Sequence, residues 1–441
     1  MDYMKKLIFF LAVLLGTTHT RAQMGKPYEL TINGVKVIVQ PSGNEIVEIR
    51  TIIKGGVQNY PEKEAGIEAL AMDALTECGT LRRDKNAFKN ALDAVSAEMG
   101  GETGMDFASF RMNCIKSDLA RVWPLYMEAL LQPKFDEKEF DRIREDALTR
   151  IKTMESNPDN AVDQMARRTA FAGQPYALDP MGTLESVKTL TAPATRDYFK
   201  KLLNRGRIFI VVVGDLPKVE LEQQLKSLLD KVPAGPAFVP KKSSFTAAVN
   251  SYNATKKDLA TNYVQGVSGA PQPGTPDYNA FMLAMRIFYN RHFVEIRSNN
   301  GLSYAPATWF SGGLTPYSVL FASTTDPNKY VITARRLLDK VRKDGFTEQE
   351  LRNMKTTYLT STYYRQETAA AQAGSLATNE VLHNNWRRSL TLNEDLKKIT
   401  LQDLNRVFNK YVTNISWVLQ GDPEKVDKNL FQQKETPVKS F

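Results

Sequence analysis

The sequence predicts an α+β protein built from two homologous domains, each a mixed β-sheet covered by helices. Three repeated blocks carry this prediction. The segment that begins at Phe135 matches the segment that begins at Phe346, since each starts with a helix N-cap and a glutamate placed for a capping box, followed by apolar residues at the same helical positions. Two further blocks repeat in the same order and at nearly the same separation: 190–203 with 399–412, and 208–215 with 415–422. Chance could produce one such block but hardly three, so the chain contains two copies of one unit.

The first copy begins with strands and continues mainly with helices. The dipeptide Asn33-Gly34 predicts a β-hairpin over 30–39, and a further strand is expected over 46–53. Amphipathic periodicity then predicts a series of helices, and an apolar run predicts the strand that closes the domain. The predicted helices are 66–78, 85–99, 117–131, 136–155, 193–204 and 218–231, the closing strand is 207–213, and the run Ser109 to Ile115 is also strand-like. This succession is typical of a mixed sheet with helices packed on it.

The N-terminus has the pattern of a secretory signal. Lys5 and Lys6 precede the apolar run Leu7 to Gly16, and a polar stretch ends at Ala22. The run is too short to span a bilayer as a retained helix, although an uncleaved anchor stays the alternative, and no later segment is apolar enough to cross a membrane. We therefore expect a secreted, periplasmic protein without a membrane segment after signal removal. Its expected parts are a signal peptide (1–22), an N-terminal domain (23–235) and a C-terminal domain (236–441).

Composition and charge indicate an ordinary globular protein. The 441 residues have a formal net charge of +9, dispersed among acidic residues, and no RNA- or DNA-binding motif occurs. Nucleic acid is therefore not expected as a partner, and a solvated surface explains the charge. The two cysteines, Cys78 and Cys114, fall on the apolar face of a predicted helix and in a predicted strand. We favour two buried free thiols over a disulfide, which export would permit.

The predicted helix 66–78 has one apolar face, and its other face decides how the chain can function. GGVQNYPEKEAGIEALAMDALTECGT, which contains this helix, resembles the opening of the pitrilysin or insulinase family of zinc peptidases, the inverzincins, in which a glycine pair precedes a "GLAHFLEHMLFKGT"-like helix. In that family, H-x-x-E-H places two histidines on one helical face as zinc ligands, with the glutamate as general base. The apolar face comprises Ile67, Leu70, Ala71, Ala74, Leu75 and Cys78.

The positions that match the zinc motif carry Ala69, Met72 and Asp73 in this chain. The family's third ligand, a glutamate farther along, falls near Arg150. Two acids lie nearby if the alignment shifts: Glu145 and Asp146. A methyl group, a thioether and one carboxylate cannot make this site, and an arginine would repel a dication. Catalytic zinc needs three protein ligands and an open position, so the resemblance implies a protease-shaped chain that holds no cofactor and cannot cut peptides alone.

The second copy contains a segment that resembles another motif of the same family. Phe293 to Tyr304, FVEIRSNNGLSY, is similar to the family's "LFQEIREKRGLAYS" segment, whose arginine and tyrosine stand here at Arg297 and Tyr304. In the family this pair binds the substrate's backbone carbonyl and stabilises the oxyanion, which suits a guanidinium and a phenol because both stay protonated donors near pH 7. The alternative is structural: Arg297 would pair with Glu295 or a neighbour, and Tyr304 would be a packed aromatic.

Other candidate residues carry weaker signals. Gly312-Gly313 is similar to a glycine-rich segment that handles substrate in some non-catalytic subunits of the family, although a turn between strands also explains it. His292 with Glu295, and Glu380 with His383, each offer two metal ligands without the further ligands that zinc needs. No nucleophile elbow, phosphate loop or dinucleotide fingerprint occurs.

A missing zinc site combined with an arginine–tyrosine pair resembles the non-catalytic subunit of heterodimeric family members such as mitochondrial processing peptidase. The resemblance covers nearly the whole mature chain and implies two homologous domains that face each other in a clam-shell around a peptide-binding chamber. It further implies a partner subunit that carries H-x-x-E-H and the zinc, a peptide substrate, and Arg297 and Tyr304 acting in trans. The alternatives are an inactive peptide-binding or scaffold protein of the same fold, and proteolysis by improvised ligands.

Overall fold

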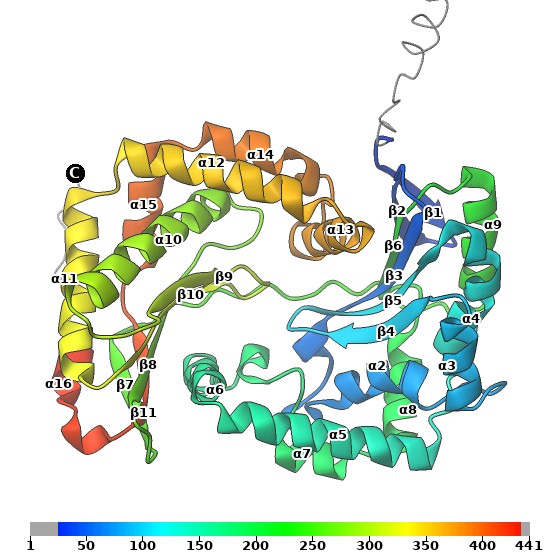
Figure 1. The fold of residues 1–441 in the computed structure, drawn as a ribbon, viewed down its shortest axis with the longest axis horizontal. Helices are drawn as coiled ribbons and strands as arrows, with labels where there is room; N and C mark the ends of the chain where they lie inside the picture. The colour runs from blue at the N-terminus through cyan, green and yellow to red at the C-terminus, as the bar shows by residue number, and fades with distance from the viewer. Residues whose placement is uncertain (1–24, 434–441) are drawn as a thin grey trace, which may run out of the picture.

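Two sheets with the same strand order form the framework of the computed structural model, which describes residues 25–433 except the side chains of residues 363–365 (Figure 1). The strands of the first sheet are β1 (Tyr28–Ile32), β2 (Val35–Gln40), β3 (Ile46–Lys54), β4 (Glu98–Thr103), β5 (Phe107–Ile115) and β6 (Ile208–Val213). Those of the second are β7 (Ser251–Lys256), β8 (Asn262–Ser268), β9 (Ala307–Ser311), β10 (Tyr317–Thr324) and β11 (Ser416–Gly421). The predicted signal peptide, 1–22, lies outside the described residues.

The order of the strands confirms the two-domain fold. The first sheet has the order β1-β2-β6-β3-β5-β4, and the second has the order β7-β11-β8-β10-β9. Apart from β1, the two orders correspond strand for strand. The pairs β2–β6 and β7–β11 are parallel, and all other neighbours are antiparallel. The two units face each other across the molecule as the clam-shell prediction requires (Figure 1).

Helices cover the sheets, and those that were predicted mostly start and stop within two residues of their expected bounds. In the first domain they are α2 (Ile67–Glu77), α3 (Lys85–Asp93), α4 (Leu119–Leu131), α5 (Glu137–Ser156), α6 (Pro158–Ala170), α7 (Leu184–Thr189), α8 (Ala192–Leu202) and α9 (Lys218–Leu229). In the second they are α10 (Asp277–Phe293), α11 (Pro327–Asp344), α12 (Glu348–Arg365), α13 (Ala369–His383), α14 (Arg388–Lys398), α15 (Leu401–Tyr411) and α16 (Lys428–Gln432).

The repeated helices α5 and α12 have the predicted N-caps, but only one has the full capping box. Thr347 and Glu350 each accept a hydrogen bond from the other's backbone N–H, at 3.2 and 2.8 Å. In the first copy, Asp136 accepts a bond from the Glu139 N–H at 3.3 Å. The Glu139 carboxylate bonds Arg142 at 2.9 Å, so it does not complete the box as expected.

The prediction of one helix over 85–99 is wrong in its second half. α3 ends at Asp93, Ser96 adopts a left-handed conformation with φ 49°, and the chain continues as β4. β4 lies at the edge of the first sheet and packs against α2, where a Cβ atom on Gly101 would lie 2.5 Å from the Met72 Cβ. Glycine disfavours a helix and permits this close approach, so the segment forms an edge strand.

One helix of each domain packs against the sheet of the other domain. α6, which the sequence patterns do not predict, packs against β8 and β11, and α13, its counterpart in the second copy, packs against β2, β3 and β6 (Figure 1). Hydrogen bonds join the same helices and sheets. Gln265 of β8 donates to Asp163 of α6 at 2.8 Å, and Arg50 of β3 donates to the Ala370 carbonyl of α13 at 3.0 Å. The domains are therefore fastened by reciprocal packing and not only by the chain that joins them.

A third contact joins the connection between β9 and β10 to the first domain. The Leu314 N–H donates to the buried Asp106 carboxylate, 3.3 Å from each oxygen, and the Tyr176 hydroxyl donates to the same carboxylate at 2.5 Å. The chain itself passes between the domains from 232 to 250 without helix or strand, and this segment contains the predicted junction. Between residues 25 and 433, none of the helices is long and apolar enough to cross a membrane.

Candidate functional site

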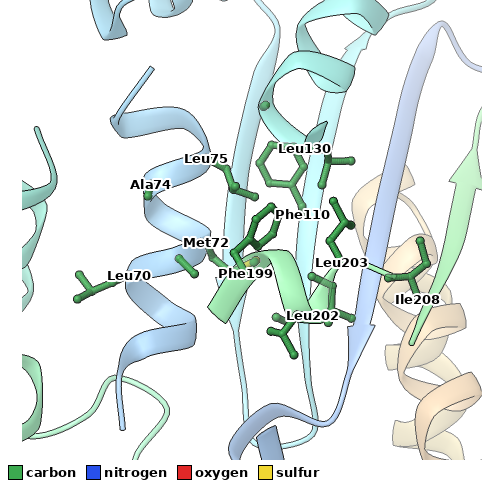
Figure 2. Packing of buried hydrophobic residues seen from close by; sticks show 14 of the residues in the cluster. Leu70, Met72, Ala74, Leu75, Phe110, Leu130, Phe199, Leu202, Leu203 and Ile208 are labelled. Carbon is green, nitrogen blue, oxygen red and sulfur yellow. The ribbon is translucent and has the colours of Figure 1, made fainter. Parts of the chain in front are cut away.

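Both faces of α2 are largely buried, so the helix that would carry a zinc motif is a core element. The six residues of its predicted apolar face are at most 3% exposed. On the opposite face Ala69 is also buried, and Met72 is 1% exposed. Figure 2 shows Met72 and Leu75 directed toward the cluster that contains Phe110 and Phe199. The position at which H-x-x-E-H has its general base is therefore occupied by a thioether packed in the core.

The other two positions of the degenerate motif, Asp73 and Arg150, form an ion pair with each other. Arg150 Nη2 lies 3.0 Å from Asp73 Oδ2, and both side chains are partly exposed. Burial raises the pKa of the Asp73 carboxyl above its ordinary value, and attraction to Arg150 opposes the rise. The cation therefore lies where the third metal ligand would be needed.

The remaining acids near this position do not complete a metal site. Asp146 pairs with Arg142 at 2.8 Å, and Glu145 is exposed. Throughout the part of the chain that the structure describes, no group of three or more His, Cys, Asp or Glu side chains is placed to hold a metal ion. The residues present at the motif positions do not fit zinc, because two ligands on α2 and the facing carboxylate are replaced.

We expect the purified chain to hold no stoichiometric zinc. Metal content after dialysis should be far below one equivalent, and added zinc should leave the thermal unfolding temperature unchanged, since a metal that does not bind the folded state cannot stabilise it. A triple variant, Ala69→His with Asp73→His and Arg150→Glu, restores three ligands and serves as the control that should gain zinc-dependent stabilisation. One tightly held equivalent in the unaltered chain would contradict this assignment.

Arg297 and Tyr304 lie against each other at the surface of the second domain. Arg297 belongs to a π-helical turn, η5 (Val294–Asn299), that follows α10. Its guanidinium carbon lies 4.2 Å from the centre of the Tyr304 ring and 5.1 Å from that of Phe293. Gly301, with φ 59°, has the left-handed conformation that lets the chain turn after η5. Tyr304 is 79% exposed, whereas Arg297 is partly buried.

The structural alternative for Arg297, a pair with Glu295, does not form. The Glu295 carboxylate accepts hydrogen bonds from the side-chain amides of Asn299 and Asn300, at 2.8 and 3.1 Å. Within residues 25–433 the Arg297 guanidinium makes its two ring contacts and neither a hydrogen bond nor an ion pair. An arginine held by stacking keeps its five N–H donors for another acceptor.

The Arg297–Tyr304 pair is remote from the contact that the connection between β9 and β10 makes with the first domain. At the N-terminal end of α10, the Tyr278 hydroxyl donates to the Gly312 carbonyl at 2.5 Å, in the connection that also reaches Asp106. α10 has 17 residues and is therefore roughly 25 Å long. Because η5 follows its other end, the pair lies about one helix length from that contact.

Gly312 and Gly313 lie in the connection between β9 and β10, as the turn alternative expects. A Cβ atom on Gly312 would overlap the Tyr278 hydroxyl, and one on Gly313 would overlap the Tyr176 hydroxyl. Close packing therefore gives both glycines a structural reason, within the second domain for Gly312 and between the domains for Gly313. A role of this pair in substrate handling stays a prediction.

The two histidines of the described chain pack against aromatic side chains. His292 is fully buried, with Nε2 3.3 Å from the Tyr330 hydroxyl, and His383 lies edge-on to Tyr278 with ring centres 5.4 Å apart. Burial lowers the pKa of His292 to about 3. Burial, together with repulsion from Arg388 and Lys242, lowers the pKa of His383 to about 4.

The low pKa values predict a loss of stability on acidification below pH 6.5. The folded chain keeps His292 neutral, whereas the unfolded chain binds a proton there near pH 6.5, so the free energy of unfolding falls as the pH drops toward about 3. The slope from this one group is at most about 1.4 kcal/mol per pH unit. Urea unfolding of the unaltered chain and of His292→Gln at several pH values isolates it, because the variant lacks the titrating group. Parallel curves for the two proteins would refute the prediction.

Cys78 and Cys114 are free and buried, as the sequence patterns favoured over a disulfide. Burial raises the pKa of the Cys78 thiol to about 12 and that of the Cys114 thiol to about 11. Both are therefore protonated and unreactive near neutral pH.

The sequence patterns do not predict two sets of contacts at these sites: the Asp73–Arg150 ion pair, and the hydrogen bonds from Asn299 and Asn300 to Glu295. The ion pair could have been predicted, because Asp73 and Arg150 carry opposite charges at two positions that a zinc motif would bring together. The contacts of Asn299 and Asn300 with Glu295 had no such signal, because they depend on the π-helical turn.

Models of one peptidase family match both domains of the chain. A family model described as Insulinase (Peptidase family M16) matches residues 36–184, and a model described as Peptidase M16 inactive domain matches residues 189–358. The protein named Non-peptidase homolog YmxG of Helicobacter pylori is 22% identical over 91% of this chain and 94% of its own length. A probable mitochondrial-processing peptidase subunit beta of Arabidopsis thaliana is 23% identical over 36% of this chain and 30% of its own.

Solved structures show the same fold. The peptidase M16 inactive domain from Pseudomonas fluorescens superposes with a TM-score of 0.80 at 18% identity, covering 90% of this chain and 98% of that one. The periplasmic protease PqqL from Escherichia coli superposes with a TM-score of 0.78 at 16% identity, covering 91% of this chain and 47% of that one. With the family matched over both domains, the chain belongs to the insulinase (M16) family of peptidases, and it carries Ala69, Met72, Asp73 and Arg150 at the positions of the zinc motif.

Proposed function

We propose that this chain is the non-catalytic subunit of a heterodimeric zinc metallopeptidase and supplies Arg297 and Tyr304 in trans to a partner that carries H-x-x-E-H. The observation that carries the proposal is the guanidinium of Arg297, stacked on Phe293 and Tyr304 and without an acceptor of its own in the described chain. Stacking fixes its direction without consuming its donors, which suits an acceptor that arrives from outside.

The chemistry of peptide hydrolysis explains why these two side chains would be useful beside a foreign zinc site. The partner would supply the metal and the attacking water. Arg297 and Tyr304 would donate hydrogen bonds to the scissile carbonyl oxygen, which gains negative charge as the tetrahedral intermediate forms. Donors that are already oriented stabilise this charge more than they stabilise the neutral carbonyl, so they accelerate the reaction and do not merely bind the peptide.

Placement favours action in trans over action within the chain. The pair lies about one α10 length from the interdomain contact at the β9–β10 connection, and the described part of the first domain has no group of side chains placed to hold zinc for it to assist. The structure does offer a place for an extended peptide, since β4 is an edge strand whose one partner among the described residues is β5, and Gly100 has open space around it. Peptides add to such edges through their backbone hydrogen bonds.

The comparisons support a subunit role and an exported location. One relative is named as a beta subunit of a processing peptidase, and another as a non-peptidase homologue. A structural neighbour is a periplasmic protease, which agrees with the secretory pattern of residues 1–22. We accordingly place the proposed heterodimer in the periplasm, with zinc in the partner subunit.

The deciding experiment compares three samples for cleavage of a fluorogenic peptide. They are the purified chain, a family homologue that carries H-x-x-E-H, and the mixture of the two. We expect the chain alone to be inactive and the mixture to cleave much faster than the partner alone. Co-elution in size-exclusion chromatography should accompany the gain.

A mixture that cleaves no faster than the partner alone would overturn the proposal. If the isolated chain nevertheless bound peptides, the result would favour the alternative of a peptide-binding or scaffold protein with this fold. Chelator-sensitive cleavage by the isolated chain would contradict both readings.

A further inference from the structure

The net positive charge of the chain belongs to its second domain. Residues 236–433 contain 24 Lys and Arg against 16 Asp and Glu, whereas residues 25–235 contain 29 Lys and Arg against 31 Asp and Glu. An uneven division of charge between two halves indicates an oppositely charged partner for the charged half. Cations that are exposed and without an ion pair show where such a partner would bind.

One side of helix α11 carries a row of four such cations. They are spaced by seven, four and three residues, so they share one side of the helix and extend over roughly 21 Å. All four are exposed, and between residues 25 and 433 none of them forms an ion pair. α11 has two acids against six Lys and Arg, and one of these acids, Asp339, is paired with Arg342 at 2.9 Å. The row, called the basic face below, consists of Lys329, Arg336, Lys340 and Lys343.

The basic face adjoins the turn that carries Arg297. α11 packs against η5, and Lys340 lines an open groove of about 540 Å³ together with Val294 of η5. Val294 is 50% exposed, and Ile332, which shares the side of α11 that carries the basic face, is 40% exposed. Exposed apolar side chains next to arginines and a tyrosine are typical of surfaces that other proteins cover.

The groove itself does not extend the positive charge. Glu295 and Asp344 line it in addition to Lys340, and its Arg291 is paired with Glu350 at 2.6 Å. The excess of cations therefore lies along α11. This helix lies at the end of the second domain that is directed away from the first domain (Figure 1), so the basic face is open to another molecule.

We propose that the basic face binds an acidic surface of the subunit that carries H-x-x-E-H. The inference rests on the proposed function, because a partner whose zinc site receives Arg297 has to lie against η5 and therefore close to α11. Opposite charges on the two surfaces steer the subunits toward each other and fix their register, without taking part in hydrolysis.

An acidic protein surface fits the basic face better than a lipid bilayer does. Helices that lie on anionic membranes combine their cations with several bulky apolar side chains that enter the bilayer. Ile332 is the one exposed apolar residue of α11, so the helix has little to insert. A protein surface with carboxylates needs only the cations.

The first test measures association with the partner by surface plasmon resonance at low and at high salt. In the charge-reversed variant Arg336→Glu/Lys340→Glu, the association rate constant at low salt should fall about tenfold. The difference from the unaltered chain should shrink at high salt, which screens exposed charges. Thermal unfolding should stay unchanged, because neither side chain is buried or ion-paired in the described chain.

A matched control makes the same change of charge in the first domain. Lys152→Glu/Lys188→Glu replaces two exposed lysines and should associate like the unaltered chain. An equal loss in both double variants would mean that net charge alone governs association. That result, or no loss in the charge-reversed variant, would overturn the inference.

The second test identifies the groups on the partner. A water-soluble carbodiimide joins a lysine amine to a carboxylate as an amide, and the carbodiimide takes up the water that is lost and becomes a urea. Peptide mass spectrometry should then find Lys329, Lys340 or Lys343 joined to Asp or Glu of the partner. Cross-links to the partner from first-domain lysines alone would contradict the proposed binding surface.

Activity of the mixture separates this inference from the proposed function. At a saturating concentration of the charge-reversed variant, kcat should equal that of the unaltered mixture, whereas Arg297→Ala should lower it. If the complex forms through the basic face but cleaves nothing, the proposed function fails and the binding surface stands. If the mixture is active and the charge-reversed variant associates normally, the binding surface is wrong and the proposed function stands.

Three further outcomes would overturn the inference. The charge-reversed variant could lose binding to phosphatidylglycerol vesicles, or lose self-association, while it keeps its association with the partner. Either result would assign the basic face to a membrane or to a second copy of this chain. Failure of the unaltered chain to form any complex with the partner would overturn both proposals.

Discussion

Replacing Arg297 by alanine is expected to lower kcat/KM of the mixed enzyme about a hundredfold or more, without loss of folding. Removing one preorganised donor from an oxyanion site typically costs a factor of about 10² to 10³ in rate. Among the residues that the structure describes, Arg297 has no ion pair to lose, since its contacts are the Phe293 and Tyr304 rings. The free energy of unfolding should therefore change little, and the defect should appear in catalysis.

The second domain offers a matched control on the same helix. Arg286 of α10 also stacks on an aromatic ring, 5.2 Å from the centre of Tyr289, and it is exposed. Arg286→Ala removes the same charge and the same kind of contact, and it should leave kcat/KM close to that of the unaltered mixture. A comparable loss in the two variants would mean that general charge, not the placed donor, explains the effect.

Two conservative variants separate charge, geometry and the hydroxyl. Arg297→Lys keeps the charge but loses the planar fork, so it should recover only part of the rate. Tyr304→Phe keeps the stacking ring and removes one donor, so its kcat should fall while substrate binding changes little. Steady-state kinetics on each mixture give these values. Unchanged kinetics in Arg297→Ala and Tyr304→Phe would remove the trans-acting role.

Much of the fold could be predicted because local signals and the final packing agree. Asn33 and Gly34 have the positive φ angles of a tight hairpin turn, 51° and 79°, and the strands on either side pair as expected. The repeat was visible for the same reason: two copies that fold alike preserve caps and apolar positions, even where the identities of the residues differ. Consistency across levels makes such elements readable from sequence.

The failures occur where a distant part of the chain decides the structure. Glu98 to Thr103 lacks clean alternation, and only the neighbouring β5 and the close approach of Met72 make it a strand. α6 begins with Pro158 after the Asn157 cap, which is a readable start signal, but its packing on the second sheet follows from the reciprocal arrangement of two domains. No local pattern encodes that exchange.

The candidate sites divide in the same way. The loss of zinc ligands at Ala69, Met72 and Asp73 needs only the residue types, so it follows from sequence. The Asp73–Arg150 ion pair and the hydrogen bond from Asn300 to Glu295 depend on contacts between turns and helices. The spacing of residues in the sequence does not predict such contacts.

The largest loss of stability is expected on substituting Trp386, which lies where α13 packs against the sheet of the first domain. This side chain follows α13, is 1% exposed and belongs to the apolar cluster between α13 and the first sheet. Its indole N–H donates to Glu29 of β1 at 2.7 Å, across the boundary between the domains. Trp386→Ala should lower the free energy of unfolding by about 3 to 5 kcal/mol, the usual cost of removing a large buried aromatic.

The cavity left by Trp386→Ala would lie between α13 and the first sheet, and this position predicts a second, more specific result. Without Trp386, α13 keeps only its smaller apolar contacts and polar links such as Lys36 with Glu380 at 2.6 Å, so the domains should separate before either one unfolds. Trp417→Ala is the control, because Trp417 is equally buried but lies within the core of the second domain. Small-angle scattering in mild denaturant should show expansion of folded Trp386→Ala and none of Trp417→Ala until it unfolds. If both variants expand alike, or neither does, reciprocal packing of α13 is not what holds the two domains together.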